Sequence, residues 1–465
     1  MPVQVRQRSQ RSLAQLAWPL LIENLLRTSL LSVDTLMLGR YSAKAVAAMS
    51  VVNQLGFFIQ LLYMVVSSGA SILIAQNLGA GRKREAGLIG VGSLTLLLGL
   101  SVVVSGSFAL LSGPLLHLYP LDPEVARYGA QFLGVYGGLS FFMALSIGLS
   151  TLLRAWGQTR GPMLVNVLCL VLTVVGNALA LFGPFGLPVF GVPGVAVSTV
   201  FSQAVGAGLL ALLIRAEGEL ELPVRELLKI PTRIYRSVLA IGLPTAGENL
   251  SYNLSQIATL AMLARLGTAS LAAYGILMAV LRYVFMPGVS IGMGAQIKAG
   301  YLVGAGEYGA AKVQVFRAFN VAFGISAVAV LLVQLLHRSI LGLFTGDQEV
   351  LAVAETVLLV ALVHEPGRNF NTVIIPALKG AGDVRFPVYV GILSMWGVGV
   401  LGAWYLGLHL GLGLPGVWMA MAADEWLRGS FMWLRWRSDA WRTKGLVGPL
   451  DGEETLAVVE VGEGL

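Results

Sequence analysis

Long apolar stretches recur from end to end of the chain, and they constrain its fold more strongly than any other feature of the sequence. A stretch of about 18 residues or more with few charges is long enough to cross the hydrocarbon core of a bilayer as a helix. Only 12% of the 465 residues are charged, about half of the roughly 25% that is usual in soluble proteins. Because lipid offers no hydrogen-bond partners to an open backbone, we predict an all-α polytopic membrane protein.

Twelve membrane-crossing helices are predicted along the sequence. Their approximate ranges are 13–38, 47–76, 88–112, 126–150, 162–182, 194–214, 238–264, 270–297, 313–336, 350–377, 386–408 and 414–434. With this placement about 22 of the 31 Lys and Arg residues fall on one side of the membrane and about five on the other. The positive-inside rule therefore puts both termini in the cytoplasm of a protein in the plasma (inner) membrane. The net charge of +7 reports this topology, and we expect no nucleic-acid partner.

Motifs and composition exclude several classes of protein. Cys169 is the only cysteine and lies in an apolar run, which excludes a disulfide framework and a cysteine-based metal site. The four histidines lack the HExxH spacing, and no GxxxxGK[ST] phosphate loop is present. We therefore expect no enzymatic activity and no cofactor. Any transport would be driven by an ion gradient.

An internal repeat divides the chain into two equivalent halves. WPLLIENL at 18–25 recurs as LPTAGENL at 243–250, with identical residues 225 positions apart, and LRAWGQTRGP at 153–162 recurs at the same offset as LKGAGDVRFP at 378–387. One register kept over this length indicates a duplicated six-helix unit. Because six crossings return the chain to its starting side, both halves share one orientation. Two pseudo-symmetric six-helix lobes suit alternating access, with a substrate site between the repeats.

The predicted organisation has five parts. They are a cytoplasmic N-terminal segment (1–12), an N-lobe with the first six helices (13–214), a cytoplasmic inter-lobe loop (215–236), a C-lobe with the last six helices (237–435) and a cytoplasmic disordered tail (436–465). The tail ends in DGEETLAVVEVGEGL, whose acidic composition is typical of disorder.

Three ionisable side chains interrupt the first predicted helix. Glu23, Arg27 and Asp34 stand at i, i+4 and i+11, so they share one face, and the outer two lie about 16 Å apart along the helix. A charge at the centre of a bilayer costs at least about 2.5 kcal/mol, which makes each one a functional hypothesis. Glu23 and Arg27 can also form a static ion pair. Asp34 has no closer partner than Arg27 in its own neighbourhood, which favours a functional role.

The second half carries more intramembrane charge than the first. Glu23 is kept there as Glu248, either for a function or for a shared structural contact, whereas Asp34 is replaced by Thr259. The tenth predicted helix places Glu365 and Arg368 on one face, as a functional group or as a structural ion pair.

Histidine and asparagine residues within the predicted helices each allow two interpretations. His364 is suited to helix packing or to a proton relay. Asn53 and Asn177 lie mid-helix and can serve as interhelical hydrogen-bonding groups or as site residues.

A carboxylate desolvated in a cleft binds a proton near neutral pH, and clustered oxygen atoms can hold Na⁺. Either ion would compete with a cationic substrate for the same carboxylates. This competition is the physical basis of antiport.

A set of motifs in this order resembles the multidrug and toxic compound extrusion (MATE) family over about residues 10–435. The set comprises WPLLIENLLRTSLLSVDTLMLGR, LPTAGEN, ARLGTASLAAYGI, IAQNLGAGR, YLVGAGE, LRAWGQTRGP, LKGAGDVRFP and GVPGVAVSTV. The resemblance implies twelve helices in two lobes and efflux of organic cations driven by inward flow of H⁺ or Na⁺.

The resemblance also implies roles for particular residues. The aspartate of the VDT context is a coupling residue in the family, and here it is Asp34. The family's fifth-helix asparagine is followed four residues later by an acid, but here Asn177 is followed by Leu181, so the sequence departs from a two-carboxylate site. Glu248 and Glu365 match the family's second-lobe cation site, and they are our candidates for binding Na⁺.

We therefore predict a secondary active multidrug exporter, a monomer that exchanges lipophilic organic cations for H⁺ or Na⁺. The coupling candidates are Asp34, Glu23, Asn177, Glu248 and Glu365. The cavity candidates are Arg27, Asn53, Thr199, Asn249, Tyr252, Arg282, Arg368, Asn369 and Asp424.

Two alternative functions remain open. A flippase for lipid-linked precursors would need a strongly basic cavity, which the mixed signs of the polar residues argue against. A membrane scaffold or receptor would leave the intramembrane charges without a role.

Overall fold

A computed structural model describes residues 12–117, 119–186, 188–216, 222–223 and 230–447, and helices are the only regular secondary structure within these ranges. The described helices of the first half are α2 (Leu13–Tyr41), α3 (Ala43–Gly79), α4 (Lys83–His117), α5 (Pro123–Gly138), α6 (Phe141–Ala155), α7 (Arg160–Phe182), the 3₁₀ turn η1 (Pro184–Gly186) and α8 (Gly191–Ala216). Saturated backbone hydrogen bonding of this kind is what a lipid environment requires.

The second half begins with α9 and contains several π-helical turns. Its elements are α9 (Thr232–Leu263), η3 (Ala264–Leu266), α10 (Thr268–Gly304), α11 (Tyr308–Leu335), α12 (His337–Gly342), α13 (Gln348–Asn369), η4 (Phe370–Ile374), α14 (Ile375–Gly380), α15 (Arg385–Ser394), η5 (Met395–Val400), α16 (Leu401–Ala403), η6 (Trp404–His409), α17 (Gly413–Arg437) and η7 (Arg442–Lys444). Of these, η4, η5 and η6 are π-helical.

Eight helical segments of the described chain are long and apolar enough to cross a membrane. They are α3, α4, α7, α8, α10, α11, the segment from α13 to α14 and the segment from α15 to η6. The pair α5 and α6, bent by 49° at a short break, makes a ninth if it is one crossing. The chain is thus an all-helical, multi-pass membrane protein.

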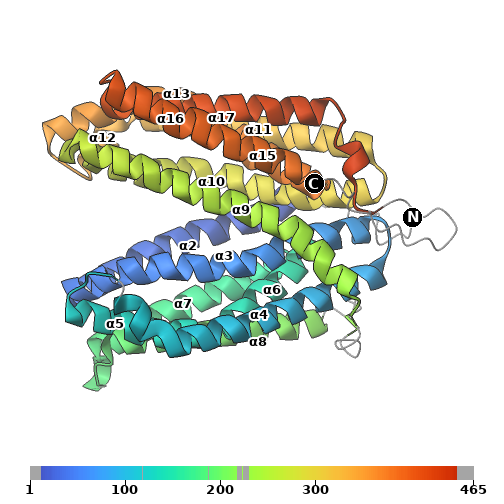
Figure 1. Ribbon diagram of the computed structural model, residues 1–465, viewed down its shortest axis with the longest axis horizontal. Coiled ribbons are helices and arrows are strands. Elements are labelled where there is room, and N and C mark those ends of the chain that lie inside the picture. Colours follow the sequence, from blue (N-terminus) through green and yellow to red (C-terminus); the bar gives the residue numbers. More distant parts are fainter. Residues whose placement is uncertain (1–11, 118, 187, 217–221, 224–229, 448–465) are drawn as a thin grey trace. The chain divides into compact units, whose positions relative to one another are not determined.

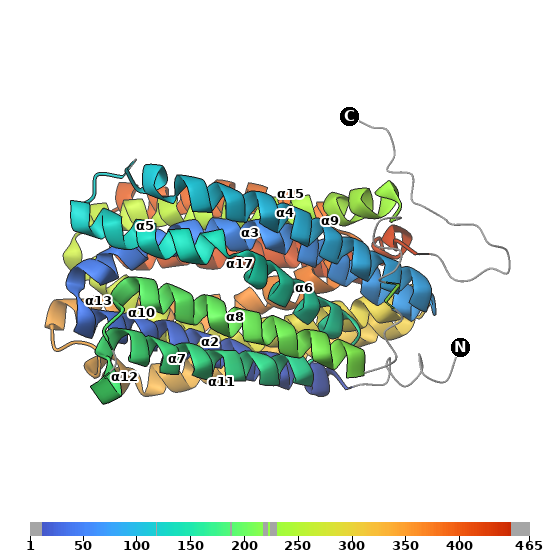
Figure 2. The same cartoon turned by 90° about the horizontal axis from the view of Figure 1, so that it is seen from below.

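The helices form two compact units. The N-terminal unit holds Ile22–Ile74 and Arg82–Ala246, and the C-terminal unit holds the segment ending at Leu21, Ala75–Gly81 and the chain from Gly247 onwards. In the N-terminal unit α7 packs on α8 and α4 packs on both α5 and α6. In the C-terminal unit α13 packs on α10, α11 and α17. The long helices within each unit run side by side (Figures 1 and 2).

The division into units follows the sequence repeat. It falls between Leu21 and Ile22 in α2 and between Ala246 and Gly247 in α9, two points 225 residues apart. The start of each helix therefore belongs to the unit of the other half. In both helices the division comes two residues after an internal proline, Pro19 or Pro244, where a backbone hydrogen bond is missing.

Two repeated aspartates begin equivalent helices. Asp122 caps α5 and Asp347 caps α13, and in each case the carboxylate accepts the N–H of the second following residue at 2.9 Å. Such a cap satisfies an N–H group that the first helical turn leaves free. In the loop before α5, the N–H of Glu124 holds the pKa of Asp122 below its usual value. Capping thus explains why the repeat keeps an aspartate at this point.

The predicted disordered tail is partly packed. Trp436 and Trp441 are fully buried, and their rings stack with centroids 4.1 Å apart. The indole N–H of Trp441 donates to the carbonyl of Trp436 at 2.8 Å. The prediction of disorder is therefore wrong for residues 436–447, because these aromatic side chains bury their apolar surface. Residues 448–465, the N-terminal residues 1–11 and most of the predicted inter-lobe loop lie outside the described residues.

Candidate functional site

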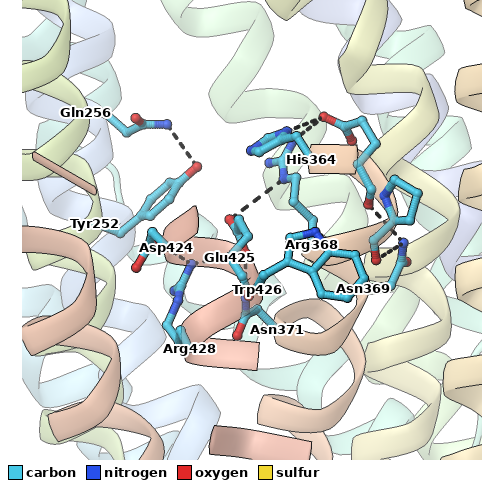
Figure 3. A network of polar contacts seen from close by, with 12 residues as sticks. Tyr252, Gln256, His364, Arg368, Asn369, Asn371, Asp424, Glu425, Trp426 and Arg428 are labelled. Carbon is cyan, nitrogen blue, oxygen red and sulfur yellow. Dashed lines mark hydrogen bonds and ion pairs between the residues drawn. The ribbon is translucent and has the colours of Figure 1, made fainter. Parts of the chain in front are cut away.

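A pocket in the C-terminal unit lies among α9, α10, α13, η5 and α17. Its lining consists of Tyr252, Ser255, Gln256, Thr259, Met278, His364, Arg368, Met395, Gly399, Val400, Met421, Asp424 and Glu425. The unfilled space, which includes the mouth open to solvent, is about 510 Å³. Figure 3 shows its charged side chains converging from α13 and α17.

The α17 side of the pocket carries two acids and one base. Arg428 lies 3.1 Å from the carboxylates of both Asp424 and Glu425. The three residues share one face of the helix because they are three and four positions apart. Ser394, the last residue of α15, donates its hydroxyl to Asp424 at 2.5 Å. Asp424 is thus held by neighbours from two helices.

The α13 side carries the complementary set. Glu365 is 1% exposed. Its Oε1 accepts a hydrogen bond from Nη1 of Arg368 at 3.2 Å and lies 3.0 Å from Nδ1 of His364. Arg368 stacks over the ring of Phe285, 3.9 Å from its centroid, and approaches Glu425 of α17 at 4.0 Å. This last contact links the two charged groups into one network.

The π turn η4 aims an additional residue at α17. The amide of Asn371 donates to the backbone carbonyl of Glu425 at 2.9 Å and to its carboxylate at 2.5 Å. A π turn adds a residue to the helical turn, so side chains that follow it leave the 3.6-residue periodicity. Asn371 therefore faces the network.

Both repeat-related glutamates form ion pairs with equivalent partners. Glu23 pairs with Arg154 at 2.5 Å in the N-terminal unit, and Glu248 pairs with Lys379 at 2.5 Å in the C-terminal unit. Arg154 and Lys379 are also 225 positions apart, in the repeated segments LRAWGQ and LKGAGD. The predicted pairing of Glu23 with Arg27 is wrong. Arg27 is exposed, and Glu23 turns to a helix distant in sequence.

Helices α2 and α7 share two carboxylate–amide contacts. Asn166 donates to Glu23 at 2.9 Å, and Asn177 donates to Asp34 at 3.0 Å. Both pairs advance by eleven residues, so one face of α2 meets one face of α7 at two levels. Glu23 also has a cationic partner. Within the described part of the chain Asp34 has an amide partner and no ion pair.

Only some of the remaining predicted residues lie at the described pocket. Arg27, Asn53 and Arg282 are exposed, and the structure brings none of them to the described pocket. Tyr252, Arg368 and Asp424 line the pocket.

Three others make local contacts along their own helices. Thr199 donates to the carbonyl of Val195 at 2.9 Å, and Asn369 donates to the carbonyl of Glu365 at 3.1 Å. The carbonyl of Asn249 accepts the amide of Asn253 at 2.8 Å. Glu248 and Glu365 each have a separate cationic partner.

Several partners of the predicted residues, in one unit or the other, were not among the site candidates. They are Arg154, Asn166, Lys379, Ser394, Asn371, Glu425 and Arg428. The repeat held a signal for Arg154 and Lys379, since both halves place a base at this position. For Asn371 and Ser394 the sequence held no comparable signal, because they reach the network across helix packing.

Comparisons with known proteins all point to one family of membrane transporters. The MatE family model matches residues 19–179 and again residues 244–405, so its two matches begin 225 positions apart, like the repeat. An uncharacterized transporter, YisQ of Bacillus subtilis (strain 168), is 35% identical and covers 94% of this chain and 96% of its own. A probable multidrug resistance protein, NorM of Thermotoga maritima, is 26% identical and covers 94% of each chain.

Solved structures share the fold. A MATE crystal structure in complex with MaL6 has a TM-score of 0.86 at 20% identity, covering 94% of this chain and 99% of that chain. A MOP superfamily transporter from Pyrococcus furiosus has a TM-score of 0.85 at 20% identity, covering 94% and 98%. Since the family model covers most of the chain in two matches and one relative is 35% identical, the chain belongs to the MatE (multidrug and toxic compound extrusion) family of membrane transporters.

Proposed function

We propose that this protein is a secondary active multidrug exporter that expels lipophilic organic cations in exchange for H⁺ or Na⁺. The observation that carries the proposal is Asp34, a carboxylate in an apolar helix with the amide of Asn177 as its partner at 3.0 Å and no ion pair among the described residues. A carboxylate without a fixed cation is free to bind one and release it again.

The pocket of the C-terminal unit fits a lipophilic cation. Met278, Met395 and Met421 offer adaptable apolar surface, and Tyr252 is 37% exposed, so its ring is available to a cation. The three carboxylates of the network outnumber its two guanidinium groups. This excess favours a cationic substrate over the pyrophosphate group of a lipid-linked precursor.

The proposal includes twelve crossings in two six-helix lobes, with both termini in the cytoplasm of a monomer in the plasma membrane. Helices α2, α9 and α17 have 29, 32 and 25 residues, so each is long enough to cross a bilayer. They coincide with the first, seventh and twelfth predicted crossings. Together with the nine apolar segments they make twelve.

Exchange follows from competition for carboxylates. An ion bound at Asp34 neutralises its charge, and release of that ion restores a site that attracts a cationic substrate. If the inward-facing and outward-facing states of the protein favour different occupants, downhill movement of the ion drives uphill movement of the substrate.

The test is dye movement in everted membrane vesicles with proton and sodium gradients imposed separately. We expect one gradient to drive uptake of a lipophilic cationic dye into vesicles that contain the protein. Uptake driven by neither gradient would contradict the proposal. Movement of a fluorescent lipid-linked phosphate in place of the dye would favour a flippase.

A further inference from the structure

His364 is a buried base, and one of its ring nitrogens has no hydrogen-bond partner among the described residues. The residue is 1% exposed, and Nδ1 lies 3.0 Å from Oε1 of Glu365. The other ring nitrogen, Nε2, is buried and has no hydrogen-bond partner among the described residues. If Nδ1 carries the proton donated to Glu365, Nε2 is a lone-pair acceptor. His364 lines the pocket.

The charges around His364 leave one negative charge unbalanced. Glu365, Asp424 and Glu425 face Arg368 and Arg428 in one connected network. The cluster therefore carries one net negative charge when His364 is neutral and none when it is protonated. The adjacent ion pair of Glu248 with Lys379 is neutral in itself and does not change this balance.

Further side chains face His364 from the helices that pack on this part of α13. From α17, Asp424 and Glu425 lie within electrostatic reach of the imidazole, and Trp418 packs edge-on with centroids 6.1 Å apart. From α10, Tyr274 packs on Trp418, and from α9, Tyr252 lines the pocket.

The remaining neighbour, α11, has its titratable residues Tyr308, Lys312 and Arg317 confined to its first ten positions. Further along this helix, Phe323 meets Trp426. Each carboxylate that faces the imidazole is thus bound to an arginine. Nε2 of His364 is a basic atom without a hydrogen-bond partner among the described residues.

We propose that His364 takes up and releases a proton at Nε2 in competition with an organic cation in this pocket, one proton for one positive charge. The inference rests on the proposed function, and it assigns to the second lobe a proton site separate from Asp34.

The physical reason is the pairing of the other groups. Each carboxylate of the network has a guanidinium partner, whereas Nε2 of His364 has no partner among the described residues, and an imidazole changes charge between about pH 5 and 8. A bound cation repels the imidazolium, so cation binding favours neutral His364. Lowering the pH must therefore weaken cation binding.

The experiment measures binding of tetraphenylphosphonium, which does not titrate, to the purified full-length protein between about pH 5 and 8 in sodium-free buffer. In the wild type we expect the Kd to rise as pH falls, approaching tenfold per pH unit at the acid end of the range. In His364→Asn the amide nitrogen can replace Nδ1 as the donor to Glu365, while Nε2 is lost. We expect its Kd to stay within about twofold across the range.

A matched control isolates His364. His409→Asn makes the same change at an exposed histidine that stacks on Trp404 and Tyr405, and it should keep the wild-type pH dependence.

A second measurement on the wild type does not depend on a variant that folds. Tetraphenylphosphonium binding in weakly buffered solution should release close to one proton per site at a pH where the Kd changes tenfold per pH unit. No release, or an unchanged pH dependence in a folded His364→Asn protein, would overturn the assignment. If dye uptake is normal in that case, only the role of His364 fails. If the protein neither binds the probe nor moves the dye, the proposed function fails as well.

Discussion

Two carboxylates on one face of α2 differ in what surrounds them. Glu23 has a base and an amide, Arg154 at 2.5 Å and Asn166 at 2.9 Å, whereas Asp34 has the amide of Asn177 at 3.0 Å. A paired carboxylate is held in its charged form, and one that lacks a cation can change its occupant. We therefore assign the two carboxylates different roles, a structural one to Glu23 and a coupling one to Asp34.

Replacement of Asp34 by asparagine should abolish gradient-driven dye uptake without loss of the protein from the membrane. The amide keeps the size of the side chain and can still meet Asn177, but it binds no proton or Na⁺. Uptake in vesicles is the measurement, normalised to the amount of protein. Glu23→Gln is the matched control, since it leaves Arg154 without its ion pair, and we expect lower thermal stability with coupling retained in the folded fraction. Wild-type uptake by Asp34→Asn would remove Asp34 from the coupling site.

Lys379→Met should destabilise the protein by about 3–5 kcal/mol, because it leaves the buried carboxylate of Glu248 without its cation. Both side chains of the pair are almost buried, at 10% and 12% exposed. Lys379→Arg should be tolerated, since Arg154 already forms the equivalent pair in the other half. Thermal unfolding of the purified protein gives the comparison. Equal stability of the two variants would argue against a structural ion pair.

At the scale of helices, α10 and η4 approach each other so closely that only glycine fits between them. A Cβ atom at Gly292 would collide with the backbone carbonyl of Thr372. The contact holds η4 at the place where Asn371 meets Glu425. Small residues at such crossings are the usual means by which membrane helices approach one another.

Gly292→Ala should destabilise the C-terminal unit by about 1–3 kcal/mol, because a backbone carbonyl cannot rotate away as a side chain can. Gly324→Ala is the control, a glycine of α11 with open space around its Cβ position. That change should be neutral or stabilise by about 0.5–1 kcal/mol. Thermal unfolding followed by size-exclusion chromatography distinguishes them. Similar melting of both variants would show that the close approach does not matter for stability.

The π turn η4 changes the helical period directly after α13. Glu365 and Arg368 stand in regular α-helix and lie on one face, as their spacing predicts. Past residue 370 the backbone is π-helical, and Asn371 turns toward α17. Spacing within a sequence assumes one helical period, so it cannot place side chains beyond a change of period.

At the scale of the molecule, the duplication reaches into details that single residues do not reveal. The ion pairs of Glu23 and Glu248, the caps at Asp122 and Asp347, and the two unit boundaries all keep the same offset. Both asparagines of α7 that contact α2 are replaced by glycine in the second half, where Gly391 and Gly402 stand at the positions of Asn166 and Asn177. The two halves therefore share a scaffold and differ in their polar groups.

Orientation in the membrane is testable because Cys169 is the single cysteine. In a Cys169→Ala background, Glu307→Cys should react with a membrane-impermeant maleimide only from the cytoplasmic side, and Gln348→Cys only from the outside. Both positions are exposed, between crossings that the charge distribution assigns to opposite faces. Labelling of both from one side would contradict the proposed topology.

By itself, the sequence determined that this chain is an all-helical membrane protein, because the length of an apolar run and the absence of water in lipid leave no other backbone arrangement. It also determined the repeat, since identical residues at one offset remain readable without a structure, and its motifs resemble those of the family. Only the tertiary structure decided which basic side chain pairs with each carboxylate. Glu23 forms an ion pair with Arg154, which lies on another helix, and not with Arg27 one turn away. The physical reason is that an ion pair forms where packed helices bring opposite charges together, and that depends on crossings and π turns that spacing along one helix does not contain.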